Sequence, residues 1–164
     1  MVLTMNGWVL RAIGLGALVV FLRAALGFAM VYWPTQGSWM RPLCLVVLLA
    51  AVVFWGVLDG RKDREVHPDP EHGSDLTILW LKTAAAAGLG SGVVSWLLDW
   101  LPRFDLGDNG LLFELTAGAS FIILLVFIPG LIGIGIGRII ADRQIDKSAK
   151  RSTPQAPGAA ATPA

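Results

Sequence analysis

A positively charged residue lies deep inside the first apolar stretch of the chain. Trp8 and Trp33 bracket that stretch, and Arg23 lies about ten residues before Trp33, which is roughly 15 Å along a helix. A guanidinium at the depth of membrane hydrocarbon costs about 2.5–3.5 kcal/mol on insertion scales, so it normally faces protein or water rather than lipid. The carboxylates that it could reach are Asp99 and Glu114, near the ends of two later apolar stretches. These three residues are candidates either for an interhelical ion pair or for a site that binds an anion or a proton.

The hydroxyl and histidine side chains that could take part in catalysis or bind a metal are poorly placed for either. The hydroxyl side chains within the apolar stretches have no histidine in those stretches to act as a base, so we expect no nucleophilic catalysis and no enzyme. The two histidines, His67 and His72, lie in a segment with Pro68 and Pro70, which favour an extended, solvated chain. This segment has no cysteine and no pair of histidines four residues apart, so it is unlike a metal site. The sequence therefore predicts no metal and no cofactor.

The composition of the 164-residue chain is that of a membrane protein. Hydrophobic residues make up 55% of it and charged residues only 15%, and the mean hydropathy is +0.65. A soluble surface could not cover so much apolar side chain, so the lipid bilayer must be the solvent. The net charge is only +1, and nothing in its distribution indicates binding to nucleic acid.

Four apolar stretches are long enough to cross a bilayer as helices. A helix needs about 20 apolar residues to cross roughly 30 Å of hydrocarbon, and the stretches near residues 8–33, 39–58, 76–101 and 111–140 meet this requirement. All seven tryptophans, including Trp80, lie near an end of a stretch, where indoles prefer the headgroup level. We therefore expect an all-α membrane domain with four transmembrane helices over residues 1–146, with a charged loop at 59–75. Residues 147–164 are rich in Ala, Pro, Ser and Thr, and we expect them to form a disordered tail.

The distribution of lysine and arginine predicts which way the chain faces. Cytoplasmic segments carry an excess of these residues, counted over the short flanking regions. Eight of them follow the second and fourth stretches, against only Arg41 and Arg103 on the opposite side. Both termini are therefore expected in the cytoplasm, in a multi-pass protein of the plasma (inner) membrane. The eight are Arg61, Lys62, Arg64, Arg138, Arg143, Lys147, Lys150 and Arg151.

Small residues recur at helical spacing within these stretches, as is usual for helices that pack closely in lipid. In the fourth stretch, Pro129 comes just before the small residues and removes one backbone hydrogen bond. It should therefore kink the fourth helix. We expect the small-residue faces to join the helices to one another and to a second copy of the chain or other membrane proteins. Arg11 and Lys82 lie close to the membrane boundary, where long side chains reach the headgroups. The glycines expected on packing faces are Gly16, Gly27, Gly88, Gly92, Gly133 and Gly137.

Several short motifs connect the chain with one family. They are WGVLDGR at residues 55–61, HPDP at 67–70, SGVVSW at 91–96 and LVFIP at 125–129. With them the chain resembles, over about residues 8–143, a small actinobacterial membrane-protein family described as bacterial four-helix drug/metabolite-transporter-like. The resemblance implies a four-helix transmembrane protein that transports a solute. Within the chain, Trp8 and Arg11 are echoed by Trp80 and Lys82, which would make a parallel 2+2 repeat of helical hairpins.

Two functions follow from these observations. The first is a carrier of a small solute, and Arg23 would suit an anionic group and repel a cationic one. The alternative is a non-catalytic accessory or scaffolding subunit that packs against other proteins of a larger membrane complex through its small-residue faces.

Overall fold

The described part of the chain is almost wholly helical. The structure, a computed structural model, describes residues 2–67, 75–99 and 111–152, with side chains placed except at 2–6, 34, 99, 111, 114 and 149–152. Its long helices are α1 (Val2–Tyr32), α2 (Gly37–Val66), α3 (Leu76–Asp99) and α5 (Ala119–Ser152). The short ones are η1 (Pro34–Gln36), α4 (Leu111–Phe113) and η3 (Glu114–Gly118), a π-helical turn that leads into α5.

Four of these helices are long and apolar enough to cross a membrane, which confirms the predicted all-α, multi-pass class. The apolar segments within them are Gly7–Tyr32, Gly37–Val66, Leu76–Leu98 and Leu115–Ser148. Large apolar side chains such as Phe21, Phe54 and Phe121 point outward and are more than half exposed. In water this surface would be unfavourable, but in lipid it is the expected one.

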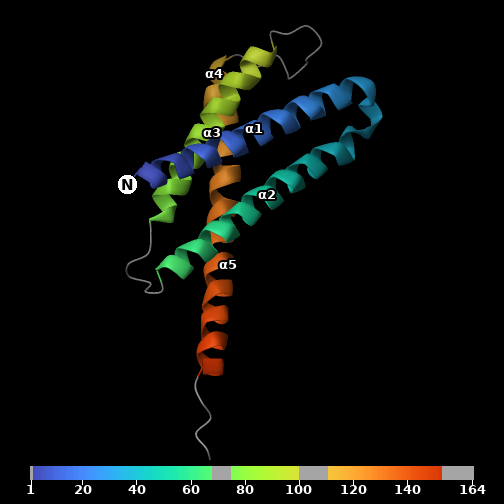
Figure 1. Cartoon of the computed structure of the whole chain (residues 1–164). Coiled ribbons are helices and arrows are strands. Elements are labelled where there is room, and N and C mark those ends of the chain that lie inside the picture. Colours follow the sequence, from blue (N-terminus) through green and yellow to red (C-terminus); the bar gives the residue numbers. More distant parts are fainter. Residues whose placement is uncertain (1, 68–74, 100–110, 153–164) are drawn as a thin grey trace, which may run out of the picture.

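The helices do not pack simply in sequence order. Helix α2 makes the most extensive contact with α5, and α3 packs against both α1 and α5, while the consecutive helices α1 and α2 share less contact. Figure 1 shows the α1–α2 hairpin leaning across α3 and α5, with its turn well away from the end of α3. The long helices therefore lie close together at one end and farther apart at the other.

The core lies where the four long helices cross. Leu15, Val52 and Val126 are almost fully buried there, together with Trp80. The indole of Trp80 has no exposed surface and covers Gly130 on α5, where a Cβ atom would clash with the ring. Trp80 was expected at the headgroup level, but its side chain faces protein instead.

Helices α2 and α5 touch backbone to backbone through glycines. A Cβ atom at Gly56 would lie 2.5 Å from the carbonyl oxygen of Gly130, and one at Gly133 would lie 2.5 Å from the carbonyl oxygen of Val53. Gly137 and Gly60 are equally close to the backbone of the facing helix. Only glycine allows contacts this short. Because later residues of α2 meet later residues of α5, the two helices run in the same direction.

The remaining predicted glycines lie on other contacts. Gly88 faces Ala119 and Ile123 on α5, and Gly16 faces Ala87 on α3 at 3.6 Å. Gly92 is buried and Gly27 is partly buried.

Two helices extend beyond the lengths that the sequence predicted. Helix α2 continues to Val66, so residues 59–66 are helical instead of opening the predicted loop at 59–75. Helix α5 continues to Ser152, so residues 147–152 of the predicted disordered tail are also helical, and residues 153–164 lie outside the described part. The extended end of α2 pairs with α5, as Arg64 does with Asp142, which a hydropathy pattern does not reveal. Pro129 lies inside α5, and the kink expected there stays a prediction.

Candidate functional site

Two carboxylates of α2 are buried at the end where the helices converge, which we call the charged end. Asp59 and Asp63 lie one turn apart, and each side chain is only 5% exposed. They continue the buried stripe of α2, which runs through Leu48, Val52 and Gly56 at spacings of four and three residues. Helical geometry thus turns both acids inward, toward the other helices.

Asp59 joins three helices. Its Oδ1 accepts a hydrogen bond from Nη2 of Arg11 on α1 at 2.7 Å, and its Oδ2 accepts one from Nε1 of Trp80 on α3 at 3.1 Å. Arg11 was expected to reach the lipid headgroups, but its side chain is only 18% exposed because it turns inward to this carboxylate. Lys82 is exposed, as a side chain that reaches headgroups would be.

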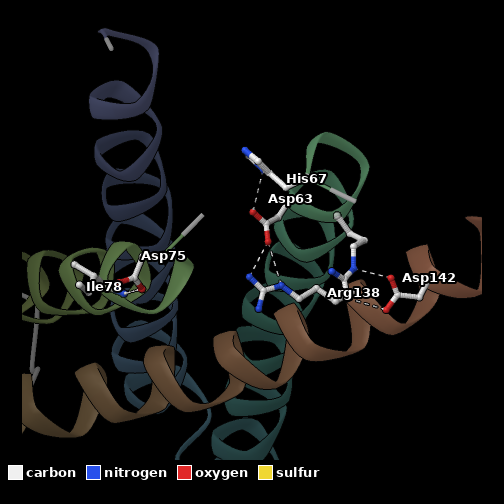
Figure 2. A network of polar contacts seen from close by, with 7 residues as sticks. Asp63, His67, Asp75, Ile78, Arg138 and Asp142 are labelled. Carbon is white, nitrogen blue, oxygen red and sulfur yellow. Dashed lines mark hydrogen bonds and ion pairs between the residues drawn. The ribbon is translucent and has the colours of Figure 1, made fainter. Parts of the chain in front are cut away.

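Asp63 joins α2 to α5. Its Oδ2 accepts hydrogen bonds from Nη2 and Nε of Arg138, at 2.7 and 3.1 Å, and its Oδ1 lies 3.7 Å from Nδ1 of His67. Figure 2 shows Asp63 between His67 and Arg138, with Asp142 on the neighbouring turn of α5. At the next residue of α2, Nε of Arg64 lies 2.6 Å from Oδ1 of Asp142.

These ion pairs connect α2 to α1 and to α5 at defined positions along the helices. A buried ion pair repays its own desolvation only with good geometry, and replacing both partners by apolar residues is often neutral. Removal of a single partner leaves an uncompensated charge and costs about 3–5 kcal/mol when the site is fully buried. Asp59 and Asp63 therefore require Arg11 and Arg138 once the helices have closed.

A polar pocket opens beside these pairs, between α1, α2 and the start of α3. Its volume is about 400 Å³. Asp75 at its edge caps α3, since Oδ1 accepts a hydrogen bond from the backbone N–H of Ile78 at 3.3 Å. The polar side chains that line the pocket are Arg11, Asp59, Lys62, Asp63, His67 and Asp75.

An apolar groove of about 750 Å³ lies between α1 and α3. Small residues form part of its walls, including Ala12, Gly16 and Ala86. Gly90 also lines it, and a Cβ atom there would meet nothing within 4 Å. The groove therefore faces the lipid as an open, weakly polar surface.

The residues singled out from the sequence lie elsewhere. Arg23 is partly buried and is not without an interaction partner, but it lines neither the polar pocket nor the apolar groove. The side chains of Asp99 and Glu114 lie outside the described part, so the pairing of Arg23 with either stays a prediction. The backbone of Glu114 begins the π-helical turn, where Thr116 Oγ1 donates to the carbonyl of Leu112 at 2.6 Å.

Sequence reasoning missed Arg11, Asp59, Asp63 and Trp80 as a connected group. A usable signal was present, because both acids continue the spacing of the apolar stripe of α2. Among the described residues, no group of three or more His, Cys, Asp or Glu side chains is arranged to hold a metal ion. Compared with known proteins, the chain matches no protein-family model and no curated protein sequence.

Proposed function

We propose that the chain is a plasma-membrane carrier of a small solute, as its resemblance to the drug/metabolite-transporter-like family implies. The observation that carries this proposal is the polar pocket of about 400 Å³ at the charged end. A pocket of this size suits a small molecule, and its charged groups can fix the orientation of that molecule. Charged groups beside membrane-crossing helices are costly, and they commonly mark solute or ion paths.

The orientation of the carrier belongs to the same proposal. The excess of Lys and Arg in the last two turns of α2 and along α5 supports a cytoplasmic position for the charged end and for both termini. Since α1 lies along α3 and α2 lies along α5, two hairpins related by a parallel repeat are consistent with the contacts. Four helices enclose little interior volume, so we expect the carrier to work as a homo-oligomer.

Reconstitution into liposomes tests this function. Purified protein should move at least one solute from a panel of small anions, cations and zwitterions, and Arg11→Gln should abolish that flux. Lys82→Gln is the matched control, because Lys82 is an exposed cation that does not line the pocket. Absence of flux for every solute in the panel would refute the carrier. Loss of flux in Arg23→Gln but not in Arg11→Gln would move the site to Arg23.

A second function, that of a non-catalytic accessory subunit, is favoured by the apolar groove. A glycine inside a helix costs about 1 kcal/mol relative to alanine, so one that no neighbour requires suggests a close contact with another helix. Gly90 is such a residue. Extraction in mild detergent should then recover a larger membrane complex, and Gly90→Leu should release it.

The matched control for the accessory role is Gly135→Leu. A Cβ atom at Gly135 also meets nothing within 4 Å, but this residue does not line the groove. Recovery of only a monomer or homodimer from native membranes would contradict the accessory role. Equal release by both leucine variants would show that the groove is not the contact.

A further inference from the structure

We infer that the polar pocket binds an oxyanion, the carboxylate or phosphate group of a small molecule, through Arg11 and Lys62. This inference deepens the proposed carrier function, because it names the class of solute. It rests on a comparison of the hydrogen-bond donors and acceptors that the pocket presents. The side chains that matter are Arg11, Lys62 and the three lining carboxylates.

The acceptors of the pocket are largely occupied by protein donors. Both oxygens of Asp59 accept hydrogen bonds, from Arg11 and Trp80. Asp63 accepts two from Arg138, and Asp75 accepts one from the backbone at the start of α3. A ligand that offered only donors would therefore compete with bonds already made.

The donors of the pocket are less fully used. Arg11 uses Nη2 for its bond to Asp59, whereas its Nη1 makes no hydrogen bond to the described part of the chain. Lys62 is exposed at the pocket, and no hydrogen bond or ion pair joins its ammonium to a described residue. Both cations therefore keep N–H donors that an arriving acceptor can use in charge-assisted hydrogen bonds.

The positions of the two cations suit an oxyanion. The Arg11–Asp59 ion pair holds the guanidinium in place, and Gly7 leaves room for Nη1, which lies 3.2 Å from the position of a Cβ atom there. Arg11 balances Asp59 and Arg138 balances Asp63, while Lys62 balances Asp75. Recognition therefore depends on unused N–H donors rather than on net charge, as in charge-assisted hydrogen bonds to carboxylate or phosphate.

Two sources can supply this chemistry at the end of a membrane-crossing helix. One is a soluble anion from the aqueous side, and the other is the headgroup of an anionic phospholipid. Both present oxyanion oxygens that Arg11 and Lys62 could bind. The experiment has one arm for each source.

In the first arm, full-length protein in phosphatidylcholine nanodiscs is titrated with inorganic phosphate, and binding is followed by calorimetry. In the second arm, the nanodiscs contain phosphatidylglycerol, and bound lipid is counted by native mass spectrometry. We expect binding in at least one arm, weakened about tenfold or more by Arg11→Gln and by Lys62→Gln. Lys82→Gln should bind as the wild type does.

Because Arg11→Gln also removes the partner of Asp59, Lys62→Gln is the variant that keeps the test decisive if the first fails to fold. Absence of binding in both arms, or binding that neither substitution weakens, would overturn the inference. Flux without such binding would leave the carrier standing and remove the oxyanion site. Binding without flux would support the oxyanion site and refute the carrier.

Discussion

Alanine substitutions at two kinds of glycine should have opposite effects on stability. A Cβ atom at Gly56 would lie 2.5 Å from the carbonyl oxygen of Gly130, whereas ordinary van der Waals contact begins at about 3.4 Å. Helices α2 and α5 would therefore have to separate by about 0.9 Å, and the neighbouring glycine contacts would separate with them. Overpacking of this kind costs about 1–3 kcal/mol. The loss of stability in Gly56→Ala should lie in the upper half of that range, because the atom that the Cβ meets belongs to the backbone rather than to a flexible side chain.

Gly90→Ala and Gly135→Ala are the matched controls. A Cβ atom at either position meets nothing within 4 Å, and alanine is the better helix former by about 1 kcal/mol. These variants should therefore be neutral or slightly more stable than the wild type. Equilibrium unfolding in mixed detergent micelles with increasing dodecyl sulfate, followed by loss of helical circular dichroism, gives the free energies. If Gly56→Ala lost no more stability than Gly90→Ala, the close α2–α5 contact would be refuted.

Four further substitutions, one of them a control, test the charged end by the same unfolding measurement. Trp80→Phe removes the indole donor to Asp59 but keeps an apolar ring, so it should cost about 1–2 kcal/mol, and no loss would contradict the hydrogen bond. Arg138→Gln should cost about 2 kcal/mol, less than for a fully buried pair because the Arg138 side chain is 39% exposed. Its combination with Asp63→Asn should recover part of that loss, and simple additivity would argue against the pair. Lys82→Gln should change stability by less than about 0.5 kcal/mol, since the residue is exposed.

The membrane-crossing helices could be predicted because lipid imposes a length and a composition on each of them. The predicted ends of α2 and α5 were wrong, because charged residues continue both helices and hydropathy does not reveal this. Residues 59–66 looked like a loop because they are charged, yet charged residues such as Arg and Lys form helices readily. Their ion pairs with α5 stabilise helical residues that hydropathy alone assigns to a loop.

The candidate site was harder to predict, because burial within a membrane helix depends on its neighbours. Arg23 drew attention by its depth, whereas Arg11 lies nearer the boundary, and its partner is far away in the chain. Nothing in a single sequence shows that Arg11 meets Asp59, since the pairing arises from the crossing of α1 over α2. Gly56 and Gly60 were likewise overlooked, because only the facing backbone of α5 shows why they must be small.

Cysteine labelling from each side of the membrane tests most directly whether four spans bring both termini and the charged end to the cytoplasm. Cys44, the only native cysteine, is replaced by serine, and single cysteines are placed at Gln36, Glu65 and Ser148, which are exposed. With a membrane-impermeant maleimide, Gln36→Cys should react in intact spheroplasts, whereas Glu65→Cys and Ser148→Cys should react only after permeabilisation. Labelling of Glu65→Cys and Ser148→Cys from opposite sides, or of Gln36→Cys and Glu65→Cys from the same side, would contradict the four-span arrangement.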